Sequence, residues 1–209
     1  MSNIVVKGNT SGAGTTTLQS ANTGSSATFT LPGTDGTNGQ AITTDGSGNL
    51  GFTSVVTTSA NNTFTATQTF NGTSSVLAMV LADAAETTTI SATAATGTIN
   101  YDVTTQSVLY YTSNASANWT VNFRGSSGTS LNTLLSTGQS ITVAFLVTQG
   151  STPYYNNAVQ VDGASVTPKY QGGTAWTSGN ASSVDGYTYT IVKTGNAAFT
   201  IFAAQTKFA

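Results

Sequence analysis

Short stretches rich in β-branched and aromatic residues recur along the chain, with clusters of Gly, Asn, Asp and Ser between them. Several alternate apolar and polar positions with a period of two, the pattern of a half-buried β-strand. The pattern therefore predicts an all-β protein. The predicted strands are residues 27–31, 40–44, 49–53, 75–81, 87–93, 97–103, 107–112, 118–124, 140–148, 157–163, 187–193 and 198–204.

The density of apolar residues divides the chain near residue 75. Before it, short predicted strands alternate with glycine-rich turns, as in "LPGTDGTNGQAITTDGSGNLGF" at residues 31–52. Such a thin segment leaves strand edges unpaired, so we expect residues 1–75 to form an attachment and oligomerisation segment that leans on other copies or on a larger assembly. After residue 75, longer strands at close, regular spacing predict an antiparallel β-sandwich or jelly-roll domain over residues 76–209.

Two stretches also fit a helix. In "SLNTLLSTG", Ser130 is a suitable N-cap, the leucines 131, 134 and 135 share one face, and Gly138 is a stop signal. We predict a short helix there. The run "VLAMVLADAAE" at residues 76–86 has helical periodicity as well, but its first half favours a strand.

Asp-Gly and Asn-Gly dipeptides stand between many of the predicted strands. They favour tight turns, because Gly accepts a positive φ at little steric cost. Asp35 or Asp45 is alternatively a calcium ligand, but calcium requires six to eight oxygen ligands, usually including several carboxylates, and each loop supplies one aspartate. We predict turns and no metal site. The dipeptides considered are Asp35-Gly36, Asn38-Gly39, Asp45-Gly46, Asp162-Gly163 and Asp185-Gly186.

Composition narrows the possible functions. Charged residues make up 6% of the chain and the net charge is −2, with no basic cluster, so we expect no nucleic-acid partner. The chain has no Cys, which excludes disulfides and thiolate metal sites. Its N-terminus lacks the pattern of a signal peptide, and its longest apolar run is far shorter than the ~20 residues of a membrane helix. We expect a soluble protein without a cofactor.

Candidate catalytic residues are scarce. The chain has no His, the usual general acid or base, and Glu86 is its one glutamate. Two arrangements stay open on sequence alone: Asp102 paired in space with another aspartate, or a serine nucleophile with a lysine base. No spacing in the sequence supports either, and we predict that the protein is not an enzyme.

Three aromatic residues stand in loop-like surroundings rich in Gly, Asn and Ser. Tyr154 and Tyr155 lie in "STPYYNNA", and Trp176 lies in "YQGGTAWTSGNASS". Aromatic rings in such loops provide rigid area for contact with a carbohydrate or a protein. The alternative is that these rings cap the core of the sandwich from its loops.

Several phrases of the chain resemble known proteins. "TFTATQTFNGTSS", the stretch at residues 31–52, "GTINYDVTTQSVLYYTSNASANWTVNFRG" and the sequence from residue 155 to the end are similar to virion structural and tail-fibre proteins of tailed phages, especially phages of marine bacteria such as cyanobacteria. The resemblance implies a non-enzymatic, homotrimeric virion protein that contacts other virion proteins. Its N-terminal part would anchor to the particle, and its C-terminal β-domain would attach to a host-surface glycan or protein.

The length of the chain leaves other functions open besides that of a tail fibre. At 209 residues it is short for a long tail fibre and has no extended repeat array. A capsid decoration protein that stabilises the head shell fits the length as well. A glycan-binding adhesin module is a further alternative.

Overall fold

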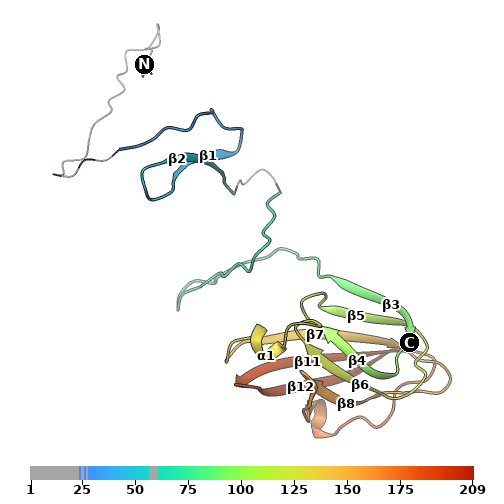
Figure 1. Cartoon of the computed structure of the whole chain (residues 1–209). Helices are drawn as coiled ribbons and strands as arrows, with labels where there is room; N and C mark the ends of the chain where they lie inside the picture. The colour runs from blue at the N-terminus through green and yellow to red at the C-terminus, as the bar shows by residue number, and fades with distance from the viewer. Residues whose placement is uncertain (1–23, 25, 27, 57–60) are drawn as a thin grey trace. The chain divides into compact units, whose positions relative to one another are not determined.

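The computed structural model describes residues 24, 26, 28–56 and 61–209. It contains two compact units, Met1–Met79 and Val80–Ala209 (Figure 1). The division lies between Met79 and Val80, where the apolar pattern predicts it between residues 75 and 76. Regular structure in both units is almost entirely β.

In its described part, the first unit contains a single hairpin. Strands β1 (Gln40–Thr44) and β2 (Leu50–Ser54) pair antiparallel, which confirms the strands predicted at residues 40–44 and 49–53 to within one residue. The strand predicted at residues 27–31 is wrong over its described residues. One bridge between Thr30 and Asn49 is present instead, and it joins this stretch to the start of β2 at a single point.

The second unit is a sandwich of a six-stranded and a four-stranded sheet (Figure 1). The large sheet has the order β10 (Lys169–Tyr170), β12 (Ala198–Phe208), β11 (Val184–Gly195), β7 (Ser140–Thr148), β5 (Val108–Ser113) and β3 (Thr88–Ala94). The small sheet has the order β4 (Gly97–Asp102), β6 (Trp119–Arg124), β8 (Asn156–Val161) and β9 (Ala164–Ser165). The all-β sandwich is thus confirmed, and eight of these strands overlap predicted ones.

The chain alternates between the two sheets as it runs from β3 to β8. Strands β3, β5 and β7 are parallel neighbours in the large sheet, and β4, β6 and β8 are parallel neighbours in the small one. Parallel neighbours need a crossover connection, and here each crossover is a strand of the opposite sheet. The predicted antiparallel pairing is therefore wrong for this part, because strands that follow one another along the chain lie in different layers.

Antiparallel pairing closes the sandwich after β7 and β8. Strand β11 pairs with β7 on one side and with β12 on the other, and β9 pairs with β8. The turn predicted at Asp185-Gly186 is wrong, since both residues lie inside β11 opposite Lys207 and Thr206. The turn predicted at Asp162-Gly163 is confirmed between β8 and β9, where Asp162 has a φ of 50°.

Large aromatic side chains fill the space between the sheets. Trp119 and Phe123 of β6 face Tyr187 and Tyr189 of β11, with ring centroids 5.6 Å apart for Trp119–Tyr187 and 4.9 Å apart for Phe123–Tyr189. All four rings are almost fully buried. Edge-to-face packing of this kind adds about 0.5–1.5 kcal/mol per pair beyond the burial of area. The alternation of the sequence thus places one continuous core between two layers.

A short helix stands between β6 and β7. Helix α1 (Leu131–Leu134) begins after Ser130, whose hydroxyl accepts a hydrogen bond from the backbone nitrogen of Thr133, so the predicted N-cap is confirmed. The helix ends at Leu134, earlier than Gly138. Leu131 is buried, Leu135 is partly buried against the core and Leu134 is exposed, so the three leucines do not share one buried face as predicted.

The strand predicted at residues 75–81 is wrong for the isolated chain. Here the backbone makes one bridge, between Thr73 and Val76, and joins no named strand. A strand requires a neighbour for its N–H and C=O groups, and the described part of the chain supplies none. The large apolar side chains in this run, all exposed, are Val76, Leu77, Met79, Val80 and Leu81.

Candidate functional site

Trp176 lies in the loop between the 3-10 turn η1 (Gln171–Gly173) and β11. Its indole Nε1 donates a hydrogen bond to the backbone carbonyl of Asn156 at 2.6 Å. Its ring meets Tyr170 and Tyr187 edge to face, with centroids 4.8 and 5.2 Å apart. The side chain is half-buried against the core. This geometry fixes Trp176 to the sandwich and leaves only part of the ring for contact with another molecule.

Tyr154 and Tyr155 lie directly before β8. Tyr154 packs against the core, and its backbone nitrogen and carbonyl both bond to the Gln149 side-chain amide, at 3.0 and 2.7 Å. The backbone nitrogen of Tyr155 donates to the Asn118 side chain at 3.0 Å. Both tyrosine side chains are partly exposed. Asn156, the next residue, holds Trp176, so the structure links the three predicted site residues through the start of β8.

Asn156 is the residue that organises this end of the sandwich. Its side chain is 2% exposed, donates to the carbonyls of Trp119 and Ala158, and accepts from the Tyr189 hydroxyl at 2.9 Å. A buried amide with both ends bonded is stabilising, whereas an unpaired one is costly. Sequence reasoning missed Asn156 because it is one of many asparagines in turn-rich stretches.

Asp185 is a second buried polar residue at the same end. Its fully buried carboxylate accepts hydrogen bonds from Gln149 Nε2 at 3.0 Å, from the backbone nitrogen of Asn180 at 3.0 Å and from the Asn180 side chain. Every donor is an amide, so the charge is stabilised without a cation. The carboxylate thereby holds the loop before β11 onto the β7–β8 loop.

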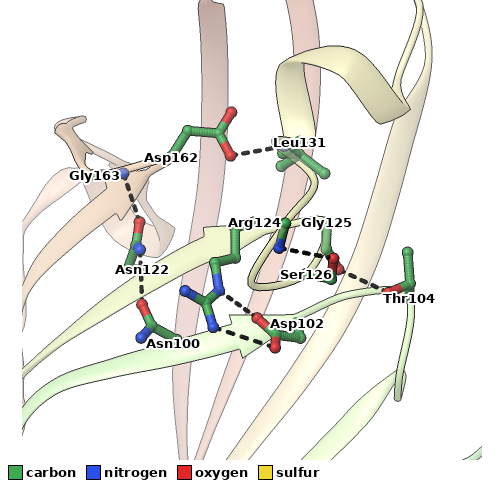
Figure 2. A network of polar contacts seen from close by, with 11 residues as sticks. Asn100, Asp102, Thr104, Asn122, Arg124, Gly125, Ser126, Leu131, Asp162 and Gly163 are labelled. Carbon is green, nitrogen blue, oxygen red and sulfur yellow. Dashed lines mark hydrogen bonds and ion pairs between the residues drawn. The ribbon is translucent and has the colours of Figure 1, made fainter.

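The outer face of the small sheet carries a polar network (Figure 2). Asp102 of β4 and Arg124 of β6 stand opposite each other in register, with Arg124 Nε and NH2 at 2.5 and 3.3 Å from the two carboxylate oxygens. The hydrogen bond to Asp102 raises the pKa of the Arg124 guanidinium. In the adjacent row, Asn122 donates to Asn100 at 2.8 Å. Asp102, the residue considered for a carboxylate pair, is instead bonded to an arginine.

Asp162 links this face to α1, as Figure 2 shows. Its two carboxylate oxygens accept from the backbone nitrogens of Leu131 and Asn132, at 2.7 and 2.9 Å. These N–H groups have no partner within the helix, and a carboxylate is the favoured acceptor at a helix N-terminus. Asp162 therefore anchors α1 to the β8–β9 turn.

Lys193 of β11 holds the other end of α1. Its side chain is 7% exposed, and Nζ donates to the carbonyls of Asn132 and Leu135 at 2.5 and 2.8 Å. Carbonyls at a helix C-terminus attract a cation. The helix thus receives a carboxylate at its start from the β8–β9 turn and an ammonium group at its end from β11.

The turn considered for calcium is closed by nitrogen donors. The Asp45 carboxylate accepts from the Asn49 side chain and the backbone nitrogen of Ser47, each at 2.7 Å, and these bonds lower the pKa of Asp45. Gly46 follows with a φ of 82°, as predicted for a tight turn. Within residues 24, 26, 28–56 and 61–209, no group of three or more Asp, Glu, His or Cys could hold a metal ion.

An open hollow of about 530 Å³ lies on the outer face of the large sheet, over β10, β12 and β11. The Phe202 ring is 49% exposed there. A hollow that combines an aromatic ring with hydroxyl, amide and ammonium groups suits a small polar ligand. The other side chains that line it are Lys169, Tyr170, Gln171, Thr188, Thr190, Ala203 and Ala204.

Comparison with family models, with curated proteins and with solved structures finds no match for this chain. Among the residues that the structure describes, no helix is long and apolar enough to cross a membrane.

Proposed function

We propose that this chain is a structural protein of a phage particle, of the fibre or appendage type. In this proposal the chain forms homotrimers, its N-terminal segment anchors it to other virion proteins, and its C-terminal sandwich is exposed for attachment to a host surface. The protein acts by binding and carries out no catalysis.

The observation that carries the proposal is the contrast between the two units. The second unit has a core of nineteen buried apolar residues, all of them between Ala95 and Ala203. In the described part of the first unit most large apolar side chains are exposed, and only Leu50 and Phe52 of the hairpin are partly buried. A segment of this kind gains stability by packing against other chains. These exposed side chains include Phe29 at 63%, Leu31 at 62%, Ile42 at 60%, Phe64 at 53% and Phe70 at 56%.

The use of charge in the sandwich also supports a structural role. Asp102 pairs with Arg124, Asp162 and Lys193 hold the ends of α1, and Asp185 holds a loop. Each of these charged groups bonds to the protein's own backbone or side chains. A sandwich held together by these contacts keeps its outer faces and loops in fixed positions.

Immunogold labelling of intact particles tests the proposal. The expected result is label confined to the tail, at a fibre or appendage. Label over the head would favour a capsid decoration protein and contradict the fibre assignment, and particles without label would overturn the virion proposal. Light scattering of the purified chain at micromolar concentration gives a separate test, because a strict monomer contradicts the trimer.

The hollow at Phe202 supports a second candidate, a glycan-binding adhesin module. An exposed ring beside Lys169, Gln171 and Thr188 offers a stacking surface and hydrogen-bond partners to a saccharide. Phe202→Ala should then abolish binding on a glycan array while leaving the thermal unfolding midpoint nearly unchanged. Equal binding by Phe202→Ala and the parent chain would exclude this site.

A further inference from the structure

The apolar segment at residues 75–81, "SVLAMVL", has the sequence of a strand but pairs with no strand in the part of the chain that the structure describes. Its large side chains are 44% to 82% exposed, from Met79 to Val80. The segment contains no charged residue, no Pro and no Gly. Such a stretch gains stability only when a neighbouring strand takes its backbone groups and a surface covers its side chains.

The sandwich has one long free edge in its large sheet. Strand β3, seven residues long, pairs with β5 on one side, and no strand of the described residues pairs with its other side. Natural proteins protect free edges with very short strands, lysines or prolines. The opposite edge of the large sheet follows this rule, since β10 has two residues. In the small sheet the edge strand β9 has two residues, and the other edge strand, β4, carries the charged Asp102. Strand β3 carries no charged residue and no Pro, so its edge is open to a further strand.

The outer face beside this edge is apolar. Ile90 of β3 is 68% exposed and stands in register with Tyr110 of β5, which stands in register with Leu146 of β7. An added strand would place every second side chain on this outer face, and the one opposite Ile90 would extend the row. Donor segment and acceptor edge match in lack of charge and in apolar character, and the regular part of the edge, before the register shift between Ser91 and Ala94, is Thr88–Ser91.

We propose that residues 75–81 of one copy add as a strand to the free edge of β3 in a second copy. The connection from the segment to its own β3, "ADAAET" at residues 82–87, contains no Gly, Asn or Pro. Tight hairpins are built with Asn-Gly, Asp-Gly or other glycine pairs, and the turn-forming residue here, Asp83, has no glycine beside it, so the sequence does not favour a tight hairpin back onto the same chain. A second copy supplies the same uncharged edge without this turn.

This strand donation rests on the self-association part of the proposed function and is independent of the particle. Donor and acceptor are different surfaces of one chain, so the contact is heterologous. Two copies can exchange their segments reciprocally, or several copies can each donate a segment to the next around a closed ring. A ring of three copies is the arrangement that the proposed trimer requires.

Engineered cysteines test the contact directly, because the chain has no Cys of its own. Val80→Cys and Ile90→Cys variants are made separately, mixed, refolded together and treated with a short bis-maleimide. The expected product is a covalent heterodimer, with the Val80–Ile90 link identified by mass spectrometry. The control replaces Ile90→Cys with Thr188→Cys, an exposed outward position on β11, and should give no such product.

Three outcomes would overturn the proposal. One is the absence of the Val80–Ile90 product from mixtures in which a monovalent maleimide labels both cysteines. Another is an equal yield from the Thr188→Cys control. The third is a Val80→Cys/Ile90→Cys double variant that cross-links only within one chain.

A second variant asks whether the segment drives self-association. Leu77→Lys/Val80→Lys places charges on two side chains that are exposed in the isolated chain. We expect loss of the oligomer by light scattering and an unchanged unfolding midpoint of the sandwich. An oligomer that persists would contradict the strand donation while leaving the virion proposal intact. Absence of label from particles would overturn the virion proposal while leaving the cross-link intact.

Discussion

The Asp162 carboxylate accepts a hydrogen bond from the backbone nitrogen of Leu131, 2.7 Å away, and so fixes the first turn of α1. Asp162→Ala should destabilise the protein by about 0.5–2 kcal/mol, the usual cost of losing a cap. Asp162→Asn should cost less, because Asn retains the turn and one acceptor oxygen. Urea unfolding of the three proteins measures the difference, and equal midpoints would show that Asp162 does not hold the helix.

Trp176 provides a test that separates binding from core packing. Trp176→Phe removes the bond to the Asn156 carbonyl and should destabilise the protein by about 0.5–1.5 kcal/mol. Trp176→Ala also removes the contacts with Tyr170 and Tyr187, and should cost more. Thermal unfolding and cell binding are measured together. Loss of binding with unchanged unfolding would assign Trp176 to recognition instead of core packing.

Gly179 is predicted to tolerate no side chain. A Cβ there would overlap the Tyr154 carbonyl and lie 2.7 Å from Asp185 Oδ2. Gly179→Ala should therefore destabilise the sandwich by about 1–3 kcal/mol. Gly128→Ala is the matched control, since a Cβ at Gly128 meets nothing within 4 Å. Similar unfolding midpoints for the two variants would contradict the close packing at this loop.

Buried tyrosines predict a loss of stability in alkali. Burial raises the pKa of Tyr189 well above its ordinary value of 10, and it also raises the pKa of Tyr101 and Tyr187. The unfolded chain releases these protons at lower pH than the folded one, so stability is full below about pH 10 and falls as the pH rises above it. Denaturant midpoints across that range measure the effect.

Comparison of the Tyr101→Phe variant with the parent chain measures how much Tyr101 contributes to this pH dependence of stability. Tyr101→Phe removes one titrating hydroxyl, along with its bonds to the Ser107 and Ala144 carbonyls. Its stability should be lower near neutral pH and should decline less steeply in alkali than that of the parent chain. A decline of equal slope would show that Tyr101 does not contribute to the pH dependence.

The strands of the sandwich could be predicted from local pattern, and their pairing could not. Alternation along β7 and β11 places Phe145 and Tyr189 inward whatever the direction of the neighbouring strand, so it indicates that each strand exists and which face is buried. It carries no information on whether a neighbour runs parallel. The two-residue strands β9 and β10 are too short to show a pattern.

The buried polar residues show a second limit of prediction from the sequence, which concerns contacts between distant residues. Asp185 precedes a glycine, and local turn chemistry therefore predicts a turn. Instead three amide groups, one of the distant Gln149 and two of Asn180 on the preceding loop, bind its carboxylate inside the strand. Ser130 was predictable as an N-cap because its partner, Thr133, is three residues away. Sequence reasoning found the contacts that are local and missed those that the fold brings together.

The winding of the chain between the two layers governs how the sandwich forms. Thr88 aligns with Val108, and Val108 aligns with Ala144, so strand neighbours are far apart in the sequence. Such high contact order slows folding. Because each crossover is itself a strand of the opposite sheet, neither sheet can unfold while the other stays folded. The domain should therefore open only as a whole, which gives it kinetic persistence without a single disulfide.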